Sequence, residues 1–194
     1  MPQQPPIYFE WIYEDVPGAA SMKSLAVEFD VLDAINRGRS IAADFPDDAA
    51  FHMDPKRSKN VMLVDNVYNA ETFPLVSSAV RDFLVEQEIS QLELLPVSII
   101  DHRGRTAADD YALVHPCRIV DCIDQEQSEF KWNKLDPTAM APVSRMVLDP
   151  KKLGPDDLLI RPRYVEHLVL VHQNLAERLM SQEFRGLWMA HLNE

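Results

Sequence analysis

Residues 75–88 read L-V-S-S-A-V-R-D-F-L-V-E-Q-E, and this stretch decides much of the fold. Its apolar side chains recur at intervals of three and four, which is the spacing of one face of an α-helix. Pro74 comes just before it, and Ser77 or Ser78 is placed to cap the first turn. We therefore predict an amphipathic helix over residues 76–88.

A second stretch repeats part of this pattern 95 positions later, where residues 170–183 read L-V-H-Q-N-L-A-E-R-L-M-S-Q-E. The two stretches align without gaps and share the L-V start, a leucine at 84 and 179, and the Q-E end. Two copies of a strand–helix–strand unit would produce this match, but so would the composition that amphipathic helices share. A second helix is predicted over residues 174–182. The match at an offset of 95 indicates either two similar lobes or two helices of similar composition.

Short strands account for most of the remaining pattern. Residues 7–13, I-Y-F-E-W-I-Y, alternate between the two faces of a strand. Pro96 cannot donate a ladder hydrogen bond, so it predicts a sheet edge or a bulge within residues 92–101. The fold class is α+β, with a mixed, largely antiparallel sheet of short strands and two main amphipathic helices. The other predicted strands are 60–65, 111–114, 118–122, 143–148, 158–161 and 184–192.

The N-terminal third gives weaker signals. Residues 15–23 contain Pro17 and Gly18 and are predicted to form a loop. Residues 25–35 mix the two periods and fit either a strand or a short helix. Residues 42–59 combine aspartates and prolines with few aliphatic side chains, so we expect a long surface loop there.

Length and composition favour one globular domain over residues 1–194. Hydrophobic residues make up 46% of the 194 residues and charged residues 26%, which is enough to build a core. The start of the chain lacks the pattern of a signal peptide, and no apolar run approaches the about 20 residues that span a bilayer. We expect a cytoplasmic protein without a membrane partner. Cys117 and Cys122 are five apart in a predicted strand, so they should point to opposite faces and remain free thiols.

The net charge of −12 argues against a nucleic-acid partner, because such binding relies on Lys and Arg against phosphates. The charge is uneven along the chain. Residues 82–129 hold 11 acidic and 3 basic residues, a balance of −8, whereas residues 130–163 hold 4 and 7, a balance of +3. This polarity would steer a basic partner toward one face.

Common catalytic and cofactor motifs are missing from the sequence. The five glycines, at 18, 38, 104, 154 and 186, are too far apart for a phosphate-binding loop, and neither a G-x-S-x-G elbow nor an H-E-x-x-H helix occurs. Cys117 and Cys122 lack the spacing of a zinc site. We therefore expect no metal and no cofactor, and a protein that is not an enzyme.

One acidic cluster has the composition of a binding surface. Asp124 and Gln127 form a D-x-x-Q pattern, which predicts that Asp124 caps a turn into a short helical segment. Trp132 lies nearby, although packing in the core is the better expectation for that side chain. The predicted partner-binding residues, here and on the strand before the cluster, are Asp109, Asp110, Asp121, Asp124, Glu126 and Glu129.

From residue 73 onward, the chain contains a series of strand, cap and turn patterns. They are F-P-L-V-S-S-A-V-R-D-F-L at 73–84, L-P-V-S-I-I-D and its R-G turn at 95–104, Y-A-L-V-H-P at 111–116, I-V-D-C-I-D-Q-E-Q-S at 119–128, R-M-V-L-D at 145–149, L-L-I-R-P at 158–162, and F-R-G-L-W at 184–188 beside the closing helix. In these stretches the chain resembles immunity protein family eleven of the bacterial polymorphic toxin systems, while residues 1–72 match it poorly. The resemblance rests on scaffold patterns and not on a chemical signature.

The resemblance implies a cytoplasmic protein that binds and neutralises a cognate toxin, and it assigns no binding residue. Two other functions fit the same sequence. One is a hydrolase or transferase that uses His102 or His172 with a loop carboxylate, which a deep pocket collecting those groups would favour. The other is an adaptor or chaperone of a secretion locus.

Overall fold

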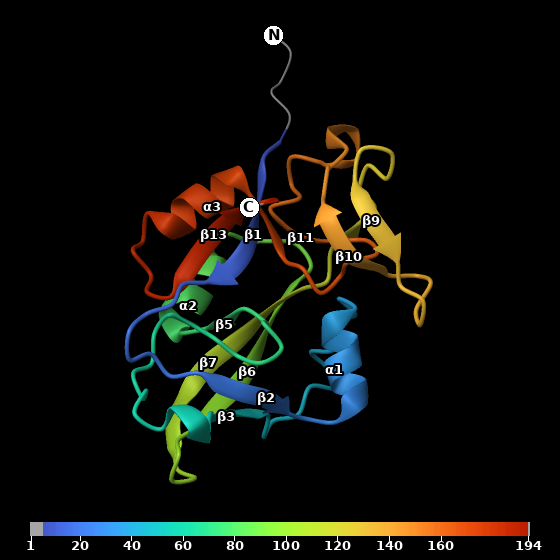
Figure 1. The fold of residues 1–194 in the computed structure, drawn as a ribbon. Coiled ribbons are helices and arrows are strands. Elements are labelled where there is room, and N and C mark those ends of the chain that lie inside the picture. The colour runs from blue at the N-terminus through green and yellow to red at the C-terminus, as the bar shows by residue number, and fades with distance from the viewer. Residues whose placement is uncertain (1–5, 194) are drawn as a thin grey trace.

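The computed structural model describes residues 6–193 and contains two main sheets, three α-helices and a separate two-stranded hairpin (Figure 1). This architecture confirms the α+β prediction, with the strands divided between sheets. Neighbouring strands are antiparallel except at β3–β6 and β8–β11. None of the helices within residues 6–193 has both the length and the apolar character needed to cross a bilayer.

We call the six-stranded sheet with α1 and α2 the six-stranded lobe, and the five-stranded sheet with α3 the five-stranded lobe. The helices are α1 (Phe29–Asn36), α2 (Ser78–Glu86) and α3 (Gln173–Met180), with short 3-10 turns at Pro55–Arg57 and Pro150–Lys152. The six-stranded sheet has the order β2 (Met22–Ala26), β3 (Ala50–Met53), β6 (Leu92–Ile100), β7 (Thr106–Pro116), β5 (Leu75–Val76), β4 (Asn66–Val67). The five-stranded sheet has the order β13 (Leu187–His191), β1 (Tyr8–Tyr13), β12 (Leu170–His172), β11 (Leu159–Pro162), β8 (Ile119–Val120), and the hairpin pairs β9 (Glu129–Trp132) with β10 (Met140–Arg145).

The sequence echo corresponds to a structural duplication. In β5–α2–β6 and in β12–α3–β13, the two strands of the unit flank a central strand that is antiparallel to both, which is β7 in the first copy and β1 in the second. The cross-strand registers match at the same offset of 95. We call three residues that lie directly opposite one another on adjacent strands a row. The row Leu75–Leu113–Leu95 in the first copy corresponds to the row Leu170–Glu10–Ala190 in the second. Similar helix composition does not produce such a register, so the structure supports two similar lobes.

The two copies of the strand–helix–strand unit bury equivalent positions in one core that both lobes share. Phe83 on α2 meets Phe184, which follows α3, in an edge-to-face contact with ring centroids 5.9 Å apart. Burial of these side chains supplies the hydrophobic stabilisation that joins the lobes. The equivalent pairs, all fully buried, are Val76 and Val171, Val80 and Leu175, and Leu84 and Leu179.

The N-terminal third is more ordered than its sequence suggested. Residues 25–35 contain both alternatives, because β2 ends at Ala26 and α1 begins at Phe29. The loop predicted over residues 42–59 is wrong at β3, which pairs in parallel with β6 and buries Phe51 completely. The strand predicted over residues 60–65 is also wrong, since that segment makes only an isolated bridge at Met62.

The C-terminal two thirds follow the predictions more closely. Both helices and the strands β1, β6, β8, β11 and β13 lie within the predicted segments or within two residues of them, while β7 and β10 begin earlier than expected. Pro96 pairs with β7 on one side, and β3 reaches only to Ser98 on the other, so the edge expected there is present. The segment after Asp124 is a turn followed by β9, and the short helix predicted there is wrong.

Candidate functional site

The acidic segment begins where β8 ends. Asp124 accepts hydrogen bonds through Oδ1 from the backbone N–H groups of Glu126 (3.0 Å) and Gln127 (3.1 Å), and through Oδ2 from the Gln127 side-chain amide (2.6 Å). These donors lower the pKa of Asp124, and the predicted capping role is confirmed. The Asp124 carboxylate therefore fixes the turn and leaves the exposed Glu126 side chain at its tip.

The β9–β10 hairpin carries an aromatic cluster directly after this turn. Trp132 packs edge-to-face between Phe130 and Tyr164, with ring centroids 5.3 and 5.4 Å away. It nevertheless keeps 44% of its surface exposed, so the expectation of core packing is wrong. Leu135, in the turn between the strands, is 96% exposed. Exposed large apolar groups beside charged ones are characteristic of protein-binding surfaces.

The predicted partner-binding residues fall into two separate groups. Asp109 and Asp110 lie on β7 beside α2, where Asp110 accepts a hydrogen bond from the Ser78 hydroxyl (2.8 Å). Asp121 lies in the other group, near the start of the turn, and its carboxylate is 3.7 Å from the Lys152 ammonium. The acidic groups at 109–110 and at 121–129 thus belong to different parts of the fold (Figure 1).

A buried polar cluster joins the lobes at a second place, which the sequence did not predict. Arg161 on β11 is 1% exposed and donates hydrogen bonds to the backbone oxygens of Pro116 (2.8 Å) and Glu166. Its guanidinium also lies 3.2 Å from Nδ1 of His115 on β7. Nε2 of His115 is in turn 2.9 Å from the backbone oxygen of Arg39. The cluster connects the five-stranded lobe to β7 and to the segment after α1.

This cluster stabilises the fold and does not have the properties of a metal site. Glu93, His115 and Cys117 offer ligand atoms within 4.8 Å of one another, as in a metal site. However, Arg161 donates to Nδ1 of His115, and the proton on Nε2 is directed at a carbonyl oxygen, so both ring nitrogens are occupied. Burial lowers the pKa of His115 and raises that of Cys117 to about 11. An imidazole whose two nitrogens are both engaged, together with a protonated thiol beside a guanidinium, does not match the donor set that a divalent metal requires.

The two cysteines are separate free thiols, as predicted. Burial also raises the pKa of Cys122 to about 11, so both thiols stay protonated at neutral pH and are poor nucleophiles.

The histidines proposed for an enzymatic function lie in different parts of the fold. His102 is in the turn between β6 and β7, where the carboxylate of Asp101 is already held by Arg105 (2.8 Å). His172 caps α3, accepting a hydrogen bond through Nδ1 from the backbone N–H of Asn174 (3.1 Å), and packs edge-to-face on Tyr8. His102 shares a hollow with Asp101 and His52, but the Asp101 carboxylate there is already engaged by Arg105, and His172 serves as a helix cap.

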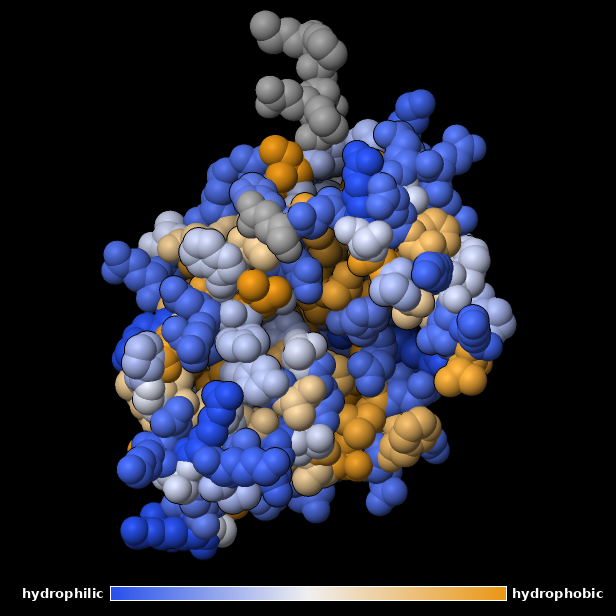
Figure 2. Space-filling view, in the orientation of Figure 1, coloured by the Kyte–Doolittle hydropathy of each residue, from blue (hydrophilic) through white to orange (hydrophobic). Residues whose placement is uncertain are grey.

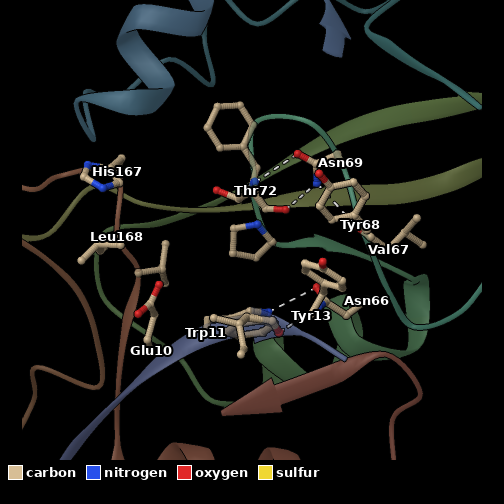
Figure 3. Close-up of a pocket in the computed structure, with 14 residues that line it drawn as sticks. Glu10, Trp11, Tyr13, Asn66, Val67, Tyr68, Asn69, Thr72, His167 and Leu168 are labelled. Carbon is tan, nitrogen blue, oxygen red and sulfur yellow. Dashed lines mark hydrogen bonds between the residues drawn. The ribbon is translucent and has the colours of Figure 1, made fainter. Parts of the chain in front are cut away.

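A cavity of about 340 Å³ lies between the two lobes (Figure 3). Its walls come from β1 of the five-stranded lobe, from β4 and the chain after it in the six-stranded lobe, and from the segment before β12. Most of the lining is apolar or aromatic, and its volume is at the lower end of the range for ligand sites. The aromatic and polar side chains in the lining include Glu10, Trp11, Tyr13, Asn66, Tyr68, Asn69, Thr72, Phe73 and His167.

Buried hydrogen bonds hold the walls of this cavity in place. The indole N–H of Trp11 donates to Oδ1 of Asn66 (3.2 Å), and Nδ2 of Asn66 donates to the backbone oxygens of Ile12 (3.1 Å) and Gly186 (2.9 Å). Asn69 closes the adjacent loop by bonding both the N–H (3.1 Å) and the C=O (2.7 Å) of Phe73. Asn66 thus ties β4 to β1 and to the turn before β13, and the cavity is preformed.

Glu10 is the acidic side chain in the lining of the cavity. Within residues 6–193 its carboxylate has no hydrogen-bond donor and no ion-pair partner, and burial raises its pKa. Sequence reasoning placed Glu10 on a strand and gave it no role. The available signal was a carboxylate inside an otherwise apolar, alternating run.

The comparisons with known proteins identify the family of this chain. The sequence matches the immunity protein family Imm11 over residues 12–194, so the match also includes most of the N-terminal part in which the resemblance was poor. A comparison with curated proteins finds no match.

Proposed function

Because this chain belongs to the immunity protein family Imm11, we propose that it binds a cognate bacterial toxin in the cytoplasm and neutralises it without catalysis. The family match over residues 12–194 is the observation that carries the proposal. The fold adds a scaffold in which two similar lobes are fixed to each other by a shared core and by buried hydrogen bonds. A rigid scaffold of this kind favours binding, because little ordering entropy is lost when the partner docks.

We place the toxin contact at the segment 121–129 and the adjoining β9–β10 hairpin, and call this the acidic–aromatic surface. Its Trp132 and Leu135 supply exposed apolar anchors, and Glu126 and Glu129 supply exposed carboxylates. Neither glutamate has an ion-pair partner within the described part of the chain. Apolar anchors within a charged rim combine desolvation at the centre with long-range attraction at the edge.

The charge of the segment 121–129, which holds four acidic residues and no basic one, favours a basic toxin. A net charge of −12 attracts a positive partner at long range, and a nuclease domain with a basic nucleic-acid groove is one class of toxin with that property. Asp109 and Asp110 provide a second acidic position on β7, which would extend the attraction across the six-stranded lobe.

Co-expression with the toxin encoded immediately upstream tests the proposal. Cells that carry both proteins should survive, and cells that carry the toxin alone should die. Continued killing in the presence of this protein would refute the immunity function. An adaptor or chaperone would instead change export of the toxin without protecting the cell, so toxin secretion is measured in the same strains.

Charge reversal at Glu126 and Glu129 tests the acidic–aromatic surface. Replacing both by lysine should slow association with the toxin and reduce the dependence of the on-rate on salt, because steering acts mainly on association. The matched control is reversal of Asp47 and Asp48, two exposed aspartates in the loop before β3, which makes the same change in net charge elsewhere. Equal effects of the two double variants would place the contact outside this surface.

A further inference from the structure

The duplication makes Glu10 an unexpected residue. In the six-stranded lobe, the central position of the row is Leu113, which is 1% exposed and packs in the core. In the five-stranded lobe the equivalent position is Glu10, between Leu170 and Ala190. The second copy therefore has an ionisable side chain where the first copy has a leucine. Departures of this kind from the expected residue type concentrate at functional sites.

The surroundings of Glu10 suit a cation. The carboxylate lines the inter-lobe cavity and lacks a donor or a positive partner within residues 6–193 (Figure 3). Half-burial makes the ionised form costly until a positive group enters. His167 also lies in the lining, at an exposed position, and its pKa is lowered by desolvation and by the charge on Arg161, so it does not supply a positive partner for Glu10 at neutral pH.

The remaining walls favour a guanidinium over an ammonium group. Tyr13 and Tyr68 supply the accessible aromatic surface of the lining and pack against each other with ring centroids 4.6 Å apart, whereas Trp11 and Phe73 are core residues that are only 4% and 5% exposed. A planar, delocalised guanidinium stacks on aromatic faces and can bond both oxygens of a carboxylate, whereas an ammonium is a compact, strongly hydrated charge. The combination of one carboxylate and several aromatic rings therefore selects arginine.

A second hollow links this cavity to the proposed toxin contact. It shares Glu10, His167 and Leu168 with the cavity and continues along Ala141, Pro142 and Val143 of β10. Strand β10 pairs with β9, which carries Trp132 of the acidic–aromatic surface. The hydropathy view shows apolar side chains in the middle of one face and in separate patches elsewhere on that face (Figure 2).

We propose that the cavity between the lobes receives an arginine side chain of the bound toxin, with its guanidinium on the Glu10 carboxylate and its stem along the aromatic side of the lining, where Tyr13 and Tyr68 are accessible. The assignment rests on the proposed function for the source of the arginine. The cavity itself can be tested without the toxin.

The probe is N-acetyl-arginine amide, titrated into the ¹⁵N-labelled full-length protein, and the readout is the indole N–H resonance of Trp11. The expected result is a saturable shift with the arginine derivative. The neutral isostere N-acetyl-citrulline amide should bind at least ten-fold more weakly, and this comparison needs no variant. Glu10→Gln should weaken the arginine probe at least ten-fold, whereas the control Glu14→Gln, at an exposed residue just after β1, should leave it unchanged.

Three results would overturn the proposal: no saturable shift, equal binding of the citrulline derivative, or an unchanged affinity in Glu10→Gln. The co-expression experiment separates this proposal from the immunity function. Survival together with any of these results removes only the arginine site, whereas killing in the presence of the wild-type protein removes the immunity function whatever the probe does.

Discussion

Replacement of Gly186 by alanine would test whether the Asn66 junction holds the lobes together. Gly186 has a φ of +81°, and a Cβ added there would lie 2.4 Å from the backbone oxygen of Asn66 and 2.9 Å from Cγ2 of Val64. Gly18 offers a matched control, because its φ is also +81° and no heavy atom lies within 4 Å of the added Cβ. The two substitutions share the same backbone strain and differ in the clash.

The expected magnitudes follow from these two contributions. A left-handed conformation costs a non-glycine residue about 1–2 kcal/mol, which is the whole effect expected for Gly18→Ala. At Gly186 the clash is with backbone in a buried strand, and relieving it by backbone shifts costs about 1–3 kcal/mol. Moving Asn66 also weakens its hydrogen bond to Gly186, worth about 1 kcal/mol. Gly186→Ala should therefore lower the free energy of unfolding by about 2–4 kcal/mol more than Gly18→Ala.

Urea unfolding followed by circular dichroism measures both variants against the wild-type protein. Equal slopes of free energy against urea would show that the difference arises in the folded state. If the two variants are equally stable, the close packing of the Gly186 turn against β4 is not a rigid contact, and the reasoning that the cavity is preformed fails with it.

Three further predictions concern the polar cluster and the hairpin. Arg161→Met should lower the free energy of unfolding by about 3 kcal/mol, because the substitution leaves the acceptors at Pro116, Glu166 and His115 unpaired. Removing the buried charge of Arg161 offsets only part of that cost. Urea unfolding measures the loss, and a value below about 1 kcal/mol would contradict the prediction. The lowered pKa of His115 means that, as the pH falls, the unfolded chain takes up the proton before the folded protein does. The free energy of unfolding should therefore fall as the pH drops below 6.5, the ordinary pKa of histidine, and His115→Gln should make this fall smaller. Unfolding at about pH 5.5 and about pH 7.5 tests this, and an equal fall in the variant and the wild-type protein would argue against it. Trp132→Ala should change the free energy of unfolding by less than about 1 kcal/mol but weaken toxin binding, measured by calorimetry, by about 2 kcal/mol or more. A large loss of stability with unchanged binding would instead show that Trp132 packs as a core residue.

Local sequence signals predict the elements whose burial is set by their own periodicity. The helix α2 and its equivalent α3 are readable because Val80 and Leu84, like Leu175 and Leu179, recur at helical spacing and are all buried. The strand β3 is not readable in this way. Phe51 is buried because β3 pairs in parallel with β6, more than 40 residues further along the chain, while the aspartates and prolines around it indicate a loop.

In the candidate sites too, the sequence predicts features set by neighbouring residues and misses those set by distant contacts. Asp124 could be assigned its capping role because its partners Glu126 and Gln127 are two and three residues away. Trp132 could not be placed, since its exposure depends on how far a separate two-stranded sheet extends beyond the main core. Arg161 could not be placed either, because its acceptors come from β7 and from the segment before β12.

The duplication explains why an acidic group can occupy the cavity without unfolding the protein. In both copies the central strand lies between two parallel strands, so the backbone at Glu10 is fixed by the same pattern of hydrogen bonds as the backbone at Leu113. The first copy uses the central position for packing in a core that also includes α1 residues. In the second copy the equivalent position opens into the space between the lobes, and there a carboxylate costs less because it is only half-buried. In the proposed arrangement, the first copy uses this position for stability, through Leu113, and the second uses it for recognition, through Glu10.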